Sequence, residues 1–167
     1  EEEIARLEQA IAQTLDYLTE LTSLAEAKFS AEIAAIFSGH HTLLDDPELL
    51  ASASQIVQQG KCTAEWAWHQ TLTDLSRQYQ QLDSPYLQAR YIDIDDLRHR
   101  TLMHLANNVE SLPALLHPTV LIADDIFPSV MLPLDKANVA AVWLKQGSLP
   151  SPSAPLARVT GTVFLSH

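Results

Sequence analysis

Hydrophobic residues recur at steps of three and four through the first 38 residues, and no Gly or Pro interrupts them. This spacing places one apolar stripe along a helix for about five turns. The residues of the stripe are Ile4, Leu7, Ile11, Leu15, Leu18 and Leu21. Ser30 precedes a second apolar run and predicts a helix that continues or restarts there, which we expect to end at Gly39.

Three more helices are predicted before residue 108. Asp46-Pro47-Glu48 has the order of an N-cap, a first-turn proline and a first-turn acid, so a helix should begin there and run to Gln59, with Gly60 as its stop. Thr63 opens the next helix, and Ser84-Pro85 opens a fifth. The apolar stripe expected to be buried in the fifth helix comprises Leu87, Tyr91, Ile94, Leu97, Leu102 and Leu105.

The pattern changes after residue 108. Thr119–Ala123 and Val139–Leu144 are short apolar runs typical of strands, a short helix should begin at Pro128-Ser129, and Thr162–Leu165 is a candidate third strand after a second helix. Strands that alternate with helices predict a parallel sheet. We therefore expect an α + α/β fold, with a helical bundle at residues 1–108 and a partial α/β subdomain at residues 109–167.

The net charge of the chain indicates which kinds of macromolecule it can bind. The chain carries 21 acidic against 10 basic residues, a formal charge of −11, which repels phosphate backbones and anionic lipid. Nucleic acid and membrane surfaces are therefore not expected partners, whereas a basic protein would be attracted. No apolar run approaches the roughly 20 residues of a membrane span. A lone cysteine, Cys62, favours a reducing compartment, so we expect a cytoplasmic protein.

Several polar groups have ordinary structural interpretations. The pair His40-His41, followed by Asp45-Asp46, is not expected to bind a metal, because adjacent histidines point apart on a helix. His40 is instead expected to face a partner or to serve the structure. The three aspartates Asp93, Asp95 and Asp96 are expected to lie on a solvated helix face. The three tryptophans, Trp66, Trp68 and Trp143, are expected to pack in the core or at a subdomain boundary.

Three segments carry a more specific signal. Residues 35–50 read AIFSGHHTLLDDPELL, residues 86–100 read YLQARYIDIDDLRHR, and residues 120–129 read VLIADDIFPS. In order and spacing they resemble the N-terminal, HPr-binding domain of the enzyme I family of phosphoenolpyruvate-protein phosphotransferases. The chain is similar in particular to the enzyme I-like domain in the phosphoryl donor subunit of bacterial dihydroxyacetone kinase.

The resemblance implies a function in the phosphotransferase system, which drives sugar transport. In the family, a histidine of the α/β subdomain takes a phosphoryl group from phosphoenolpyruvate and passes it to HPr, which docks on the helical bundle. HPr or an HPr-like domain is therefore the expected partner, and dihydroxyacetone kinase subunits are further candidates. Carried over by position, the partner-binding residues are Phe37, Gly39, His40, Thr42, Leu43, Asp46, Glu48 and Arg90.

The sequence departs from the family at the docking residues and at the reacting group. Thr42 stands where the family has a methionine, and Pro47 where it has a glutamate, so docking of the usual partner should be weakened or retuned. Pro152 falls where the family's phosphohistidine belongs, within Gly147–Arg158. Proline has no nucleophile and no titratable group, so no catalytic residue is expected to be intact.

Two classes of function remain open from the sequence. One is a degenerate phosphotransfer domain that keeps the docking fold and the family's place in phosphoryl transfer. The other is a non-catalytic structural or regulatory module that binds an HPr-like domain; a disrupted copy of the gene is a third possibility. Full-length family enzymes use magnesium, but we expect no cofactor and no metal site in this chain.

Overall fold

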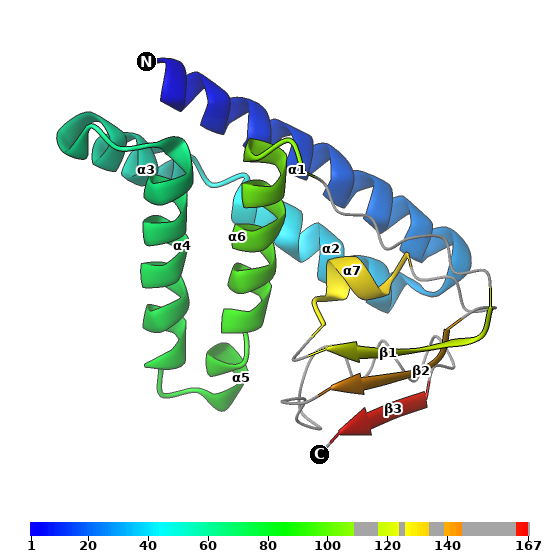
Figure 1. The fold of residues 1–167 in the computed structure, drawn as a ribbon. Helices are drawn as coiled ribbons and strands as arrows, with labels where there is room; N and C mark the ends of the chain where they lie inside the picture. The colour runs from blue at the N-terminus through cyan, green and yellow to red at the C-terminus, as the bar shows by residue number, and fades with distance from the viewer. Residues whose placement is uncertain (109–116, 124–125, 134–138, 145–162, 167) are drawn as a thin grey trace.

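The structure is a computed structural model that describes residues 1–108, 117–123, 126–133, 139–144 and 163–166. Helices occupy the first part of the chain and a small sheet follows (Figure 1). The six helices of the first part are α1 (Glu2–Lys28), α2 (Ala31–Leu44), α3 (Pro47–Gly60), α4 (Ala64–Gln80), α5 (Pro85–Gln88) and α6 (Tyr91–Leu105). This confirms the predicted helical bundle before residue 108.

Capping side chains fix where these helices begin. Ser30 accepts a hydrogen bond from the Ile33 amide, and Asp46 accepts one from the Glu48 amide at 2.9 Å. Thr63 accepts one from the Trp66 amide in the same manner. Each cap satisfies an amide that has no partner inside its helix, which is why the three predicted starts are correct.

One core holds the bundle together. The stripe of α1 packs against α2, α4 and α6, and its residues Leu7, Leu18 and Leu21 are at most 2% exposed. Phe37 of α2 and Trp68 of α4 are fully buried in the same core. Trp66 and Trp143 were expected in the core or at a boundary, but they are 58% and 43% exposed, so that prediction is wrong for both.

The predicted end of α2 at Gly39 is also wrong. The helix runs on to Leu44 because its buried face continues past the glycine: Phe37, His40 and Leu44 lie at steps of three and four. Gly39 is exposed, and a Cβ placed there would meet nothing within 4 Å. A glycine inside a helix costs roughly 1 kcal/mol relative to alanine, which packing on both sides of it offsets.

The fifth predicted helix is two helices. The amide of Arg90 donates to the Leu87 carbonyl and the amide of Asp93 to the Arg90 carbonyl, so a tighter turn separates α5 from α6. Leu87 is 40% exposed and does not belong to the buried stripe. The turn rotates α5 away from the face that α6 buries, and only the stripe from Ile94 onward lies in the core.

The sheet has three parallel strands in the order β1 (Thr119–Ala123), β2 (Val139–Leu144) and β3 (Val163–Ser166). The predicted parallel pairing is confirmed, and the third strand begins one residue later than expected. Side chains alternate between faces: Val142 is fully buried, whereas Val120 and Ile122 are 52% and 71% exposed. The helix expected between the second and third strands lies outside the described residues.

The short helix α7 (Pro128–Met131) follows β1 and packs against α6. Figure 1 shows it between the bundle and the sheet. None of the helices in the described part of the chain combines the length and apolar character that a membrane crossing requires.

Candidate functional site

A buried pair of polar side chains joins α2 to α6 near the segments that carry the family resemblance. His40 is 1% exposed and Asp93 is 5% exposed. The His40 Nε2 atom lies 2.9 Å from Asp93 Oδ1. The contact has the distance of an ion pair, although neither ring nitrogen of His40 meets the geometry of a hydrogen bond among the described residues.

The other oxygen of Asp93 reaches the surface. Arg90 Nη1 donates to Asp93 Oδ2 at 3.2 Å, and the Arg90 side chain is 45% exposed. The Arg90 guanidinium carbon also lies 5.2 Å from the centre of the Tyr86 ring, within the range of a cation–π contact. One buried carboxylate therefore connects a core histidine to a surface arginine.

The expectation that three neighbouring aspartates form a solvated face is wrong for two of them. Asp93 and Asp96 are 5% and 2% exposed. They lie three residues apart, next to Ile94 and Leu97, so helical spacing turns them to the face that α6 buries. Asp95 is the one near solvent, and it pairs with Arg98 at 3.5 Å.

Asp96 attaches α7 to the bundle. Its Oδ1 accepts a hydrogen bond from Ser129 Oγ at 2.5 Å, and its Oδ2 accepts one from the Ser129 amide at 3.1 Å. The Ser129 carbonyl accepts a hydrogen bond from the Tyr17 hydroxyl at 3.2 Å. Arg100 completes the group: it donates to Ser129 Oγ at 3.4 Å and lies 4.3 Å from the Tyr17 ring centre. Helices α1, α6 and α7 thus meet at one serine.

Burial dominates the electrostatics of this group. Desolvation raises the pKa of Asp96, against the charges of His40 and Arg100 and the hydrogen bonds from Ser129, all of which lower it. Desolvation also raises the pKa of the Tyr17 hydroxyl, an effect that Arg100 opposes. These groups hold α1, α6 and α7 together.

The eight predicted partner-binding residues divide by exposure. Phe37 and His40 are buried and offer no surface to a partner, so a direct contact from either is not supported; His40 has the structural role that was the alternative. Arg90 is accessible, and Leu43 is partly buried. The remaining four are exposed, namely Gly39, Thr42, Asp46 and Glu48. The docking role of the accessible residues stays a prediction.

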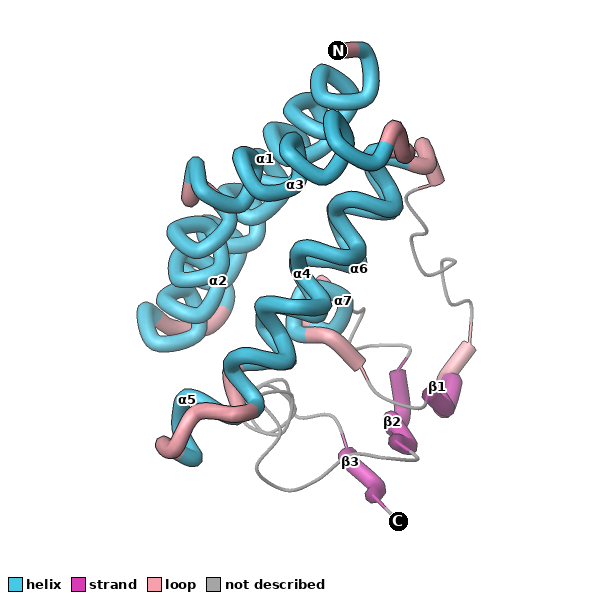
Figure 2. The backbone as a smooth tube through the Cα atoms, turned by 90° about the vertical axis from the view of Figure 1, so that its left-hand side faces the viewer, coloured by secondary structure: helices cyan, strands magenta, loops and turns pink. Residues whose placement is uncertain are grey.

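Two exposed apolar residues beside Arg90 extend this surface. Tyr86 is 69% and Leu87 is 40% exposed, both on α5. We call the exposed or partly exposed set of Thr42, Leu43, Asp46, Glu48, Tyr86, Leu87 and Arg90 the docking surface. Figure 2 shows α2 and α5 on the same side of the molecule, and the His40–Asp93 contact ties α2 to the start of α6. Leu87 was missed because its spacing fits a buried stripe.

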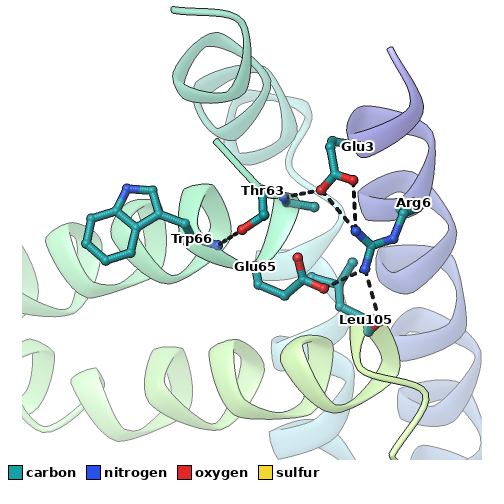
Figure 3. A network of polar contacts seen from close by, with 7 residues as sticks. Glu3, Arg6, Thr63, Glu65, Trp66 and Leu105 are labelled. Atoms are coloured by element: carbon teal, nitrogen blue, oxygen red, sulfur yellow. Dashed lines mark hydrogen bonds and ion pairs between the residues drawn. The ribbon is translucent and has the colours of Figure 1, made fainter. Parts of the chain in front are cut away.

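A second polar cluster closes the far end of the bundle (Figure 3). Arg6 pairs with Glu3 at 2.9 Å and with Glu65 at 2.5 Å, and it donates to the Leu105 carbonyl at 3.4 Å. Glu3 accepts from the Ala64 amide at 2.7 Å, and this hydrogen bond, followed by the one from Arg6, lowers the pKa of Glu3. The cluster joins the N-termini of α1 and α4 to the C-terminus of α6, and its role is structural.

The described residues contain no group of three His, Cys, Asp or Glu side chains placed to hold a metal ion. Pro152, which stands at the family's phosphohistidine position, lies outside the described residues, as do Ser151 and Arg158.

Comparisons with known proteins agree with the resemblance read from the three sequence segments. A family model for the N-terminal part of PEP-utilising enzymes matches residues 1–90. The chain is 56% identical over 160 residues to DhaM of Klebsiella michiganensis, the phosphoryl donor subunit of PEP-dependent dihydroxyacetone kinase, and 59% identical over 161 residues to the Escherichia coli subunit. Each alignment covers 96% of this chain and 34% of the relative, so the chain spans about a third of their length.

A solved structure supports the same assignment. The solution structure of an enzyme I protein (nEIt) matches with a TM-score of 0.77 and 26% identity, over 99% of this chain and 67% of that one. The likeness therefore includes both the helical part and the sheet. The chain belongs to the family of PEP-utilising enzyme N-terminal domains, with the fold of the N-terminal domain of enzyme I.

Proposed function

We propose that the chain is an enzyme I-type domain of the phosphotransferase system that docks an HPr-like phosphocarrier through its helical part. The observation that carries this proposal is the docking surface, whose accessible residues include the apolar Leu43, Tyr86 and Leu87 and the charged Asp46, Glu48 and Arg90. Specific but transient interfaces commonly combine apolar and charged residues of this kind.

Charge supports a basic partner. Asp45, Asp46 and Glu48 are exposed around the end of α2 and the start of α3, and the whole chain has a net charge of −11. Rim charges of this kind raise the association rate, while the small apolar centre sets how long the complex lasts. Because exposed charges contribute to this surface, we expect the complex to be sensitive to salt.

The likeness to DhaM suggests a particular setting. We propose that the complete protein works in the cytoplasm and passes phosphoryl groups toward dihydroxyacetone, so that dihydroxyacetone kinase subunits are further partners. Pro152 favours a second candidate function, a regulatory module that holds an HPr-like domain without accepting its phosphoryl group. The two candidates share the docking step and differ only in the chemistry.

Reversing one rim charge tests the docking step. We expect Glu48→Lys to weaken HPr binding about 5-fold at low salt, because an attraction across the rim becomes a repulsion. The loss should shrink as added salt shortens the screening length to about 8–10 Å. Isothermal titration of HPr at two salt concentrations measures both effects.

Glu2→Lys is the matched control. Glu2 is exposed and carries the same charge, but it lies beside Glu3, which contacts Ala64 just beyond the end of α3 opposite to Glu48. That helix of 14 residues is about 21 Å long, so at physiological ionic strength, where the two variants are compared, Glu2 lies about two Debye lengths or more from Glu48. Equal losses for Glu48→Lys and Glu2→Lys would argue against docking at the proposed surface.

A further inference from the structure

The surface arginine of the docking surface is held in place by one buried carboxylate, that of Asp93, and one exposed aromatic ring, that of Tyr86. Arg90 lies in the turn between α5 and α6, and Nη1 of its guanidinium is fixed by Asp93 Oδ2 at 3.2 Å. The Tyr86 ring lies against the same guanidinium, 5.2 Å from its central carbon. A side chain that rotates freely in most proteins is therefore restrained from two sides.

The Asp93 carboxylate is itself fixed by its burial and by its contacts. Asp93 is 5% exposed, so its carboxylate is largely removed from water and needs polar partners within the protein. Oδ2 faces Arg90, and Oδ1 lies 2.9 Å from His40 Nε2. His40 in turn packs edge-on against the fully buried Phe37, with ring centres 5.8 Å apart. The chain of contacts from Phe37 through His40 and Asp93 to Arg90 thus anchors a surface cation in the core.

The Arg90 side chain remains 45% exposed. Among the described residues, Asp93 and Tyr86 are the recorded partners of the Arg90 side chain. The donors that remain can take an oxygen acceptor of a docked protein in a planar, two-pronged arrangement. Because the fork is already oriented, little rotamer freedom is lost on binding, which increases affinity and selects for the position of that acceptor.

We infer that Asp93 is a positioning residue for docking, which orients Arg90 toward a carboxylate or carbonyl oxygen of the partner protein without touching the partner itself. This inference rests on the proposed docking function. It assigns a specificity role to the one cationic residue of the docking surface, whose other charged residues, Asp46 and Glu48, are acidic.

A double-mutant cycle on HPr affinity tests the inference. Arg90→Gln should weaken binding about 10-fold through loss of a restrained, charge-assisted contact. Asp93→Asn should weaken it about 5-fold in the unaltered background, because Arg90 loses its anchor. In the Arg90→Gln background the same change should cost less than 2-fold. If Asp93→Asn lowered HPr affinity equally in both backgrounds, Asp93 would act independently of Arg90, and the inference would be overturned.

Asp95→Asn is the matched control. Asp95 and Arg98 form another pair three residues apart on α6, at 3.5 Å, and neither residue belongs to the docking surface. This variant should change HPr affinity less than 2-fold. A loss as large as that of Asp93→Asn would show a general effect of removing charge from α6 and would contradict the inference.

A measurement on the free chain separates the inference from the proposed function. The side-chain Nε–H signal of Arg90 should show restricted motion by NMR relaxation in the unaltered chain, and that restriction should disappear in Asp93→Asn but persist in Asp95→Asn. Equal mobility of Arg90 in the unaltered chain and in Asp93→Asn would overturn the orientation by Asp93, whether or not HPr binds. Failure of HPr to bind the unaltered chain would instead overturn the docking function.

Discussion

Replacing Asp96 with alanine is expected to lower the free energy of unfolding by about 3 kcal/mol, a loss typical of breaking a buried hydrogen-bond network. The change removes the acceptor of both Ser129 hydrogen bonds, at 2.5 and 3.1 Å. It also leaves the 5%-exposed guanidinium of Arg100 without its nearby carboxylate. Urea unfolding gives the free energy, and hydrogen exchange of the Ser129 amide should accelerate because α7 has lost its attachment.

Asp95→Ala is the control for this prediction. Asp95 lies on the same helix, but its side chain is 21% exposed and its ion pair within the described part of the chain is with its neighbour Arg98 on α6. Removal of that pair should cost about 0.5 kcal/mol and leave Ser129 exchange unchanged. If the two alanine variants were equally stable, the group around Ser129 would not hold α7 to the bundle.

The raised pKa of Asp96 predicts the direction of a pH effect. Burial favours the protonated carboxyl in the folded chain, so its contribution to stability is present below the ordinary pKa of about 3.9 and is lost as pH rises through the raised value. The neutral Asp96→Asn variant lacks this dependence. The stability of the unaltered chain relative to Asp96→Asn should therefore fall as pH rises above about 4, as urea titrations along a pH series would measure.

The second large effect concerns chemistry. We predict that the chain accepts no phosphoryl group from phosphorylated HPr, because Pro152 stands where the family has its nucleophilic histidine. Formation of the P–N bond requires an imidazole nitrogen with a free lone pair near pH 7, and a proline in the chain has none. His167 is the only histidine after His117, and it lies fifteen residues beyond Pro152 at the chain end.

Incubation with radiolabelled phospho-HPr measures this directly, since phosphohistidine is labile in acid and stable in base. Pro152→His should restore part of the transfer, whereas Pro155→His, the same substitution three residues further on, should restore none. Recovery should be partial because the substitution restores the imidazole but leaves Pro150 and Pro155, which lack a backbone N–H, on either side of it. Stoichiometric phosphohistidine on the unaltered chain would contradict the prediction.

Local signals predicted the helix starts and the strands well. Ser30, Asp46 and Thr63 act through hydrogen bonds to amides two or three residues away, so neighbouring sequence contains all the information needed. The β-branched runs at Thr119–Ala123 and Val139–Leu144 are short enough to be read as strands, and the helix between them favours a parallel pairing.

The burial of polar side chains could not be predicted from neighbouring sequence. Asp93 and Asp96 are buried because His40 and Ser129 meet them from distant parts of the chain, whereas a charge run alone favours a solvated face. Leu87 fits an apolar stripe, yet the turn before α6 exposes it. The docking surface could accordingly be predicted in its acidic members, whereas the buried anchor behind Arg90 required the packing of α2 on α6.

The most direct test of the docking function is NMR shift mapping of HPr onto the isotopically labelled chain. The account predicts perturbations at the end of α2, the start of α3, and α5 through the start of α6, including Leu43, Glu48, Tyr86 and Arg90. Perturbations confined to the sheet and α7, with none on these helices, would contradict it.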